Sequence, residues 1–576
     1  MSSKAVGKAS PLLIGGVRDG GGAGGAPARG AARRRRAWFQ LSSWAFPAAS
    51  AVAALHLAGC WPLSYSERCE DDSRYCSPAG TAGGTVDPGP ECSGDPTQDA
   101  NIVTDRCVVF ASASAPSGGD GTKATPYSSL AEAIEKAAGK KPVLACSSDA
   151  FSSGGTFKES VTIGVASEVL GGFNCNAGWS WSAEARSMIE APADRVALTL
   201  TDDAGGTRVQ GFAIRAVDAT APGGSSIGVA IADIEATLTK VDVTAGNGMD
   251  GATGGTPEAA LNGTSAPTVV SNACVGPAAV FAGEAGVTEC DDGESRGGLG
   301  GLGGIPGMDE GNGQNGQDGT PLPAENPDGA GLGGAGQLAT QSSCARGEDG
   351  AAGAAGSPGL PGNDSDTALT LAGPVGGNGR SGTSGTRGQG GGGGGGTKGG
   401  LFCPAGANTV EGVGASGGGG DAGGCGGRAG TGGKAGGSSI GIVSLGNKLA
   451  LTEVTVTVGK AGNGGVGGDG KPGGLGGMGA AGGEPSGKVG SKQGCTGGVG
   501  GVGGDGGPGG GGRGGHALGI AYAATPSQAP ALSVVEQGTA GSGGIAGLGG
   551  PAESNGAAGV SGACWDFGAQ QACPQQ

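Results

Sequence analysis

Glycine recurs at every third position over long stretches of this chain, and this spacing limits the backbone more than any other feature. Unbroken series run over residues 464–482 and 494–515, and shorter ones run over 298–307 and 347–362. Polyproline II has three residues per turn, so such a series places one bare stripe along an extended helix. Bare stripes would let neighbouring extended helices approach closely and exchange backbone hydrogen bonds.

The glycine content leaves two interpretations of these tracts open. Glycine makes up 140 of 576 residues, whereas about 7% is usual. One interpretation is a bundle of polyglycine-II-like helices, cross-linked by Cys344, Cys403, Cys425 and Cys495. The other is disordered loops, because glycine-rich chain is also typical of flexible segments. For residues 347–362 (GEDGAAGAAGSPGLPG) a collagen-like trimer is a third interpretation.

A short apolar unit occurs three times, and each copy runs into glycine-rich chain. Residues 226–248 (SIGVAIADIEATLTKVDVTAGNG) resemble 439–464 (SIGIVSLGNKLALTEVTVTVGKAGNG), and a weaker copy spans 517–541. Val, Ile and Thr at near period two indicate half-buried strands. A repeated strand unit that cannot bury its own apolar face predicts a stacked solenoid. We therefore expect Leu238 and Leu451 in one ladder, with the glycine tracts as excursions.

The region upstream of the first glycine tract predicts one short helix and several strands. Ser129 and Glu132 have the spacing of a capping box, and the apolar residues that follow lie on one helical face, namely Leu130, Ala133, Ile134 and Ala137. Short Val/Ile/Leu-rich runs predict strands at 108–110, 143–145, 159–163, 169–173, 196–201 and 207–214. Parallel coils and an antiparallel sandwich both accommodate such strands.

The N-terminal region has the pattern of an export signal. Residues 33–36 are four arginines, 38–57 are apolar, and Leu57-Ala58-Gly59-Cys60 follows. A basic start, an apolar run and small residues before a cleavage point mark a secretory signal. The last four residues fit a bacterial lipoprotein signal, in which Cys60 would carry the lipid. An ordinary signal or a membrane anchor is the alternative, and Trp61 does not match the inner-membrane retention signal.

The cysteines predict disulfides. Without Cys60, fourteen of the fifteen remain, and exported chains normally pair their cysteines. They are Cys69, Cys76, Cys92, Cys107, Cys146, Cys175, Cys274, Cys290, Cys344, Cys403, Cys425, Cys495, Cys564 and Cys573. The sequence does not determine the pairing, although local pairs would be Cys69 with Cys76, Cys274 with Cys290, and Cys564 with Cys573. His516 would be the one histidine left after cleavage, so we expect no metal site and interpret it as a surface or turn residue.

The charge argues against a nucleic-acid partner. The chain has a net charge of −16, and residues 1–59 hold eight Lys/Arg and one Asp. Their removal leaves 26 basic and 49 acidic side chains, a net charge of −23. Such a surface repels nucleic acid. The expected partners are a lipid bilayer, through the acyl anchor, and a polysaccharide or other cell-surface matrix, with no cofactor.

Several of these motifs together resemble known families. The order GGDGTKATP, helix, VLAC, KESVTI, VLGGF resembles the entry of right-handed parallel β-helix domains of the pectate-lyase-like class. The lipoprotein signal, the segment ATAPGGSSIGVAI, the TAGNG and KAGNG run-outs and the cysteine-punctuated GGxGG tracts resemble glycine-rich lipoproteins of myxobacteria, the PGRS family. This resemblance implies an architecture and an outer-membrane or cell-surface location, and it implies no activity.

A catalytic interpretation needs acids and bases that converge in space. The best candidates are Asp202, Asp203, Arg208, Arg215 and Asp218, although Asp202-Asp203-Ala204-Gly205 also fits a turn between rungs. The GDG segments around Asp469 and Asp505 are similar to calcium-binding nonapeptides. The apolar residue expected two positions after each aspartate is missing, so we expect no calcium site.

The sequence thus predicts an all-β chain: a right-handed parallel β-helix solenoid with long glycine-rich excursions. Its segments are a signal peptide (1–59), a cysteine-containing tether (60–106), rungs with a short helix (107–245), a glycine excursion (246–437), returning strands (438–458), a second excursion (459–515), a last strand pair (516–537) and a glycine-rich tail (538–576). We expect a non-catalytic exported lipoprotein with a structural or adhesive role. The alternative is a carbohydrate-binding or polysaccharide-cleaving β-helix.

Overall fold

The computed structural model describes residues 92–149 and 154–574. These residues belong to one compact unit. The signal segment, Cys60, Cys69 and Cys76 therefore lie outside the described residues.

Two large, mainly parallel sheets form the first part of this unit. The ten-stranded sheet contains β1 (Val109–Ala111), β2 (Val143–Cys146), β3 (Thr156–Phe157), β5 (Glu168–Asn174), β6 (Ser180–Trp181), β7 (Ser187–Ala191), β9 (Thr207–Ala216), β11 (Ala236–Ala245), β19 (Leu449–Val458) and β21 (Leu532–Glu536). The seven-stranded sheet contains β4 (Val161–Ile163), β8 (Leu198–Leu200), β10 (Ser226–Ile231), β18 (Ser439–Ser444), β20 (Ala517–Tyr522), β22 (Ser561–Asp566) and β23 (Gln571–Ala572). The expected strands upstream of the first glycine tract are all present, and the parallel pairing excludes the antiparallel sandwich.

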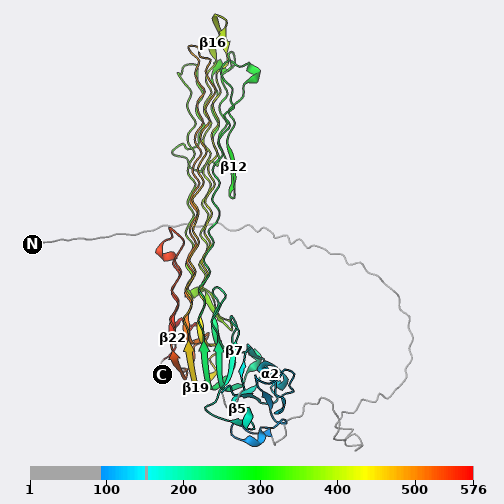
Figure 1. The fold of residues 1–576 in the computed structure, drawn as a ribbon. Coiled ribbons are helices and arrows are strands. Elements are labelled where there is room, and N and C mark those ends of the chain that lie inside the picture. Colours follow the sequence, from blue (N-terminus) through cyan, green and yellow to red (C-terminus); the bar gives the residue numbers. More distant parts are fainter. Residues whose placement is uncertain (1–91, 150–153, 575–576) are drawn as a thin grey trace, which may run out of the picture. The chain divides into compact units, whose positions relative to one another are not determined.

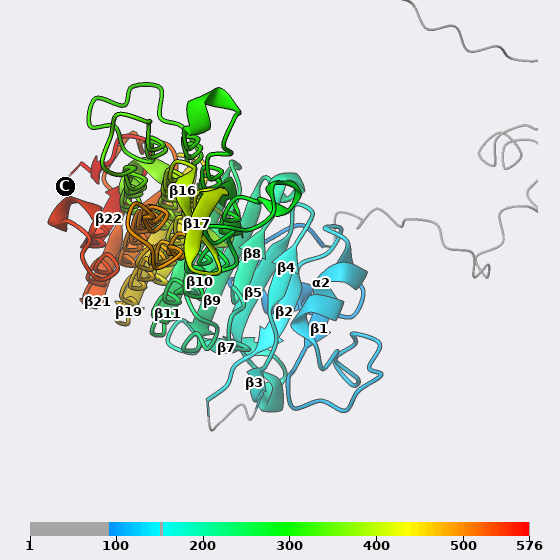
Figure 2. The same cartoon turned by 90° about the horizontal axis from the view of Figure 1, so that it is seen from above.

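From β8 to β22, apart from the separate hairpins β12–β17, the chain alternates between the two sheets, and each strand pairs with the next strand of its own sheet. In the ten-stranded sheet β9, β11, β19 and β21 are neighbours in that order, and in the other β8, β10, β18, β20 and β22 are. Figure 2 shows this succession as a continuous change of colour across the strands. The class is all-β, with mainly parallel strands.

The repeated unit aligns in space as it aligns in sequence. β11 and β19 are parallel neighbours with Leu238 opposite Leu451, although 213 positions separate the two leucines. In the other sheet Ile440 of β18 lies opposite Leu518 of β20. The expectation that distant segments share one ladder is therefore confirmed, including its register and the weaker third copy.

A column of glycines explains the repeated Ser-Ile-Gly motif. Gly228, Gly441 and Gly519 lie at equivalent positions of β10, β18 and β20. A Cβ at Gly228 or Gly441 would collide with the valine side chain that the other sheet presents, Val243 or Val456 respectively. Each turn therefore combines one glycine and one valine across the interior, which keeps the two sheets close.

One helix covers the N-terminal end of the sheets. Helix α2 (Leu130–Ala137) begins after Ser129, whose hydroxyl accepts the Glu132 backbone N–H. Its four expected apolar residues are all buried, so the predicted face is confirmed. Short 3₁₀ helices are η3 (Ala100–Ile102), η4 (Cys175–Ala177), η5 (Asp202–Ala204), η6 (Pro277–Ala279), η7 (Asp309–Gly311), η8 (Asp364–Asp366) and η9 (Ala552–Ser554).

The glycine tracts leave the end of one sheet strand and return to the start of the next. They consist of extended stretches, here called legs, that run side by side (Figure 1). Three hairpins interrupt the first tract: β12 (Val287–Cys290) with β13 (Gly293–Arg296), β14 (Thr367–Thr370) with β15 (Gly373–Gly376), and β16 (Gly400–Ala405) with β17 (Asn408–Gly412). The Gly437 N–H donates to the Met249 carbonyl at 2.8 Å, so the first tract begins and ends at one place.

Candidate functional site

The leg formed by residues 388–397 is the centre of the glycine bundle. Successive N–H groups along it donate in three directions, and each direction repeats every third residue. Gly390, Gly393 and Gly396 donate to residues 314–320, Gly391, Gly394 and Thr397 to residues 415–421, and Gly392 and Gly395 to residues 345–348. These bonds measure 2.8–3.0 Å, the normal range for N–H···O bonds.

The same leg accepts hydrogen bonds from three further stretches. Residues 298–304, 334–337 and 495–501 donate backbone N–H groups to its carbonyls. It therefore has six neighbours, and all residues from 388 to 397 are buried. A buried backbone must pair its N–H and C=O groups, and this arrangement does so without strands or helices.

Glycine is required here because of the space between the legs. A Cβ at each position from Gly390 to Gly396 would collide with a backbone carbonyl of an adjacent leg. None of these seven glycines has a φ in the left-handed region, so other residues could adopt the same backbone conformation. Close approach of backbones, one of the two usual reasons for a glycine, is thus the reason here.

In leg 494–515 the positions of the side chains depend on which sides of the leg face a neighbouring leg. Its residues fall into three sets with a period of three. Every residue of the set from Gly494 to Gly515 donates to leg 462–483, and Gly498 to Gly510 donate to residues 380–392. The third set begins with Thr496, Val499, Val502 and Asp505, all of which are exposed. Side chains therefore occur where no neighbouring leg is present.

The same set becomes glycine where a further leg arrives. Gly511 and Gly514 continue the series of Val499 and Val502, and a Cβ at either would collide with a carbonyl of leg 538–547. Their N–H groups donate to Ser554 and Ala557 of the same tract. The change from GGX to GGG thus marks the point at which the third tract joins the bundle.

The segment 347–362, with one glycine in three, is an outer leg. Its six glycines donate to leg 496–511 at intervals of three residues. Most of the residues between these glycines are exposed. Pairing within one chain therefore accounts for the collagen-like pattern. Only one side of this leg is crowded by neighbouring legs, whereas all sides of leg 388–397 are.

At the surface of the bundle, polar side chains accept backbone N–H groups that no neighbouring leg accepts. The Asp349 carboxylate accepts the Val499 N–H at 2.8 Å, and the Asn463 amide oxygen accepts the Ser542 N–H at 2.9 Å. Asp469 and Asp505, which we considered for calcium, do the same for Leu548 and Gly473. No group of three or more His, Cys, Asp or Glu within the described ranges could hold a metal ion.

Six disulfides are present among the described residues. They join Cys92–Cys107, Cys146–Cys175, Cys274–Cys403, Cys290–Cys425, Cys344–Cys495 and Cys564–Cys573. The local pair of Cys564 with Cys573 is confirmed, and that of Cys274 with Cys290 is wrong. The error has a physical cause: each of these two cysteines lies beside a leg that returns more than a hundred residues later.

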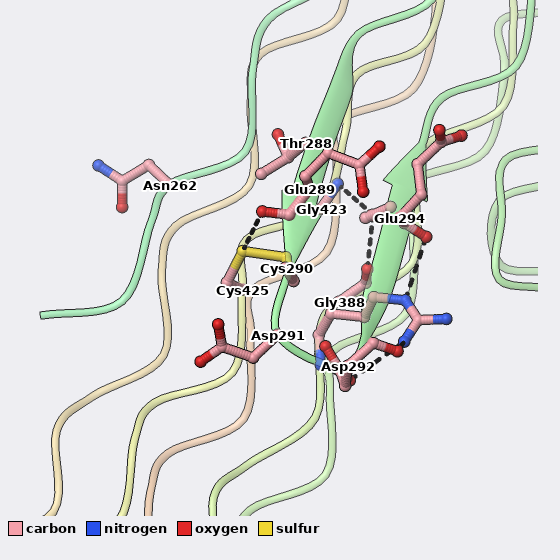
Figure 3. Close-up of a disulfide and its surroundings, with 12 residues drawn as sticks. Asn262, Thr288, Glu289, Cys290, Asp291, Asp292, Glu294, Gly388, Gly423 and Cys425 are labelled. Atoms are coloured by element: carbon pink, nitrogen blue, oxygen red, sulfur yellow. Dashed lines mark hydrogen bonds and ion pairs between the residues drawn. A yellow bond between two sulfur atoms is a disulfide. The ribbon is translucent and has the colours of Figure 1, made fainter.

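Cys290–Cys425 ties hairpin β12–β13 to leg 413–437 (Figure 3). Beside it the buried Ser295 hydroxyl donates to the Gly388 carbonyl and accepts the Gly423 N–H, both at 2.8 Å. A cavity of about 180 Å³ adjoins this disulfide. Arg428 pairs with Asp291 there and holds the pKa of that carboxyl below its usual range. The hairpin thus crosses and fixes two legs.

Asp421 is a buried carboxyl in a leg where glycine otherwise predominates. Its neighbours in the same periodic series are Gly418 and Gly424, and its side chain is fully buried. One carboxylate oxygen accepts the Ala266 N–H, and the other has no hydrogen-bond partner among the described residues. Burial raises the pKa of Asp421 to about 6, since the charged form loses its hydration.

His516 is buried, so its interpretation as a surface or turn residue is wrong. It lies where leg 494–515 enters β20, its ring packs edge-on against Phe567 and its Nδ1 accepts the Val560 N–H. Arg513, also buried, contacts the imidazole and donates to Asp364 at 2.8 Å. Burial, followed by the charge of Arg513, lowers the pKa of His516 to about 2. This cluster fixes the junction between bundle and sheets.

The acids considered for catalysis do not converge. Asp202 and Asp203 are exposed in η5, before β9, whereas Asp218 follows the other end of that strand. A ten-residue strand spans roughly 30 Å at about 3.3 Å per residue. Asp218 accepts the Asn247 N–H at 2.7 Å, a bond between successive turns.

The two arginines of that set pair with other carboxylates. Arg208 donates to Glu168 at 2.7 Å and to Asp95 at 3.0 Å. Arg215 donates to Glu190 at 3.1 Å. Arg208–Glu168 and Arg215–Glu190 join neighbouring strands, and neither arginine is paired with Asp202 or Asp218.

Comparisons with family models, with curated proteins and with solved structures found no match. No helix among the described residues is long and apolar enough to cross a membrane.

The close approach of the legs yields a prediction for a paired substitution. Gly393→Ala places a methyl group against the Leu299 carbonyl, whereas Gly255→Ala meets only the Thr431 hydroxyl at 3.5 Å. We expect Gly393→Ala to lower the free energy of unfolding by about 1–3 kcal/mol or more, the usual range for overpacking, and Gly255→Ala to have little effect. Chemical denaturation of both variants measures this, and equal stabilities would contradict the crowded interior.

Asp421 yields a pH-dependent prediction. The pKa of Asp421 in the folded chain, about 6, exceeds its ordinary value of 3.8. The contribution of the neutral carboxyl to the free energy of unfolding is therefore fully present below pH 3.8 and is lost as the pH rises through 6. A difference of this size corresponds to about 3 kcal/mol. We expect the Asp421→Asn variant to have a higher midpoint denaturant concentration than the parent at pH 8, and a similar midpoint at pH 4. A pH-independent difference would contradict the buried, unpaired carboxylate.

Proposed function

We propose that this chain is an exported, lipid-anchored, non-catalytic protein that acts as a stiff structural or adhesive spacer at the cell surface. In this proposal the two sheets form a right-handed parallel β-helix that serves as a base. The glycine legs form a polyglycine-II-like bundle that projects from it. The observation that carries the proposal is the interior leg 388–397, whose backbone is bonded to six neighbours.

Mutual hydrogen bonding supports a stiff spacer over a flexible one. A single polyproline II helix has no internal hydrogen bonds, so an isolated leg would bend easily. Here each leg is bonded sideways at intervals of three residues. An extended stretch such as 459–484 covers roughly 80 Å at about 3.1 Å per residue, a long reach for so few residues.

The disulfides support export and reinforce the bundle. Six pairs occur among the described residues, and disulfides persist mainly in oxidising compartments. Three of them, Cys274–Cys403, Cys290–Cys425 and Cys344–Cys495, connect parts of the glycine tracts. The separation of Asp202 from Asp218 favours the non-catalytic role over polysaccharide cleavage.

The anchor and the orientation are tested in one experiment. We expect labelled palmitate to be incorporated into the parent chain and to be absent from Cys60→Ser. We also expect an epitope inserted at Gly406, the exposed turn of hairpin β16–β17, to bind antibody on intact cells. A matched chain with the epitope at the C-terminal Gln576 controls for expression.

Two results would contradict the proposal. Equal incorporation of palmitate into the parent and into Cys60→Ser would contradict lipid anchoring at Cys60. An epitope at Gly406 that is reached only after permeabilisation would place the bundle inside the cell envelope.

A further inference from the structure

The two ends of the stacked sheets are finished differently. At the N-terminal end helix α2 packs against β1, β2 and β4. Residues 121–127 also cover β1, since Phe110 donates to the Gly121 carbonyl and Tyr127 donates to the Phe110 carbonyl. Terminal repeats of a stack need such caps, because the last strands otherwise expose unpaired backbone.

The C-terminal end leaves two strand edges open. In the ten-stranded sheet β21 is the last strand, and it pairs only with β19 among the described residues. In the other sheet β22 pairs with β20 along its length, whereas β23 covers only Trp565 and Asp566 on its other side. Within the described part of the chain, the β22 residues Ser561–Cys564 therefore have no strand on that side.

Apolar side chains accompany these open edges. Val535 of β21 is 71% exposed. A cavity of about 360 Å³ opens between the two strands and is lined by Leu532, Val560 and Trp565 together with the disulfide Cys564–Cys573. The Trp565 Nε1–H is buried and has no hydrogen-bond partner among the described residues. The C-terminal end of the two sheets therefore exposes strand edges and apolar side chains of the kind that are buried between neighbouring strands elsewhere in the sheets.

We propose that a second copy of this chain covers this end, so that the protein forms a twofold dimer joined C-terminal end to C-terminal end. The occupant must supply two strand edges at once, one for each sheet, and apolar side chains between them. The same end of another copy supplies all three at the required separation. The capped N-terminal end does not, and a single extended peptide could fill only one edge.

Twofold symmetry also keeps the Glu536 carboxylates of the two copies apart. In such a dimer β21 pairs antiparallel with its counterpart, so a contact at one residue is repeated at its partner. Glu536 ends β21 and Leu532 begins it. Antiparallel pairing places each Glu536 near the Leu532 end of the other strand and keeps the two carboxylates apart. The ten-stranded sheet then continues through the interface along β21, and the seven-stranded sheet continues along the part of β22 that β23 leaves open.

The test introduces a negative charge at exposed valines of the full oxidised chain, which also carries Cys60→Ser to prevent acylation. Val535→Glu places two carboxylates on the shared edge, whereas Val489→Glu alters a fully exposed loop of the bundle (99%). We expect analytical ultracentrifugation to show a concentration-dependent doubling of mass for the parent and for Val489→Glu. Val535→Glu should remain a monomer with an unchanged circular dichroism spectrum.

Hydrogen exchange supplies a second measurement that does not depend on a variant. The amides of β21 and of Ser561–Cys564 should become more protected as the concentration rises, and those of α2 should not. A parent chain that stays monomeric at every soluble concentration would overturn the proposal. So would a dimer that Val535→Glu leaves intact.

Discussion

The structure depends on backbones that approach one another closely enough to hydrogen-bond sideways. In the leg 388–397 every direction around the chain is occupied by another leg, and a single methyl group at Gly393 would displace a carbonyl. Glycine normally costs stability because it is flexible when unfolded. Here the lateral hydrogen bonds, the disulfides and the packed sheets beneath offset that cost. The absence of side chains is therefore the condition for assembly.

The sheets set the register that the legs continue. Leu238 and Leu451 are paired with an offset of 213 residues, and the Asn262 side chain accepts the Leu475 N–H with the same offset. An extended glycine chain has few side chains of its own to define its alignment. Because each leg emerges from a strand whose neighbours are already fixed, the first hydrogen bonds of the bundle are aligned before it begins.

Much of this could be predicted from the sequence, because the decisive signals are local. The repeat fixed the pairing of Leu238 with Leu451, and the helix face was read from spacing. The glycine tracts were ambiguous, since Gly390 to Gly396 would read the same in a flexible linker. Long-range pairs such as Cys274–Cys403 depend on where a leg returns, which composition does not encode. His516 is buried because Arg513 and Phe567 meet there from distant segments.

Site-resolved amide hydrogen exchange on the purified, oxidised protein shows whether the glycine legs form an ordered, hydrogen-bonded bundle. We expect strong protection for residues 390–397, whose N–H groups all have carbonyl acceptors. We expect rapid exchange for Val502 and Asp505 in the same bundle, whose N–H groups have no acceptor among the described residues. Slow exchange thus follows bonding to neighbouring legs. Exchange of residues 390–397 at the rate of an unfolded chain would contradict a hydrogen-bonded glycine bundle.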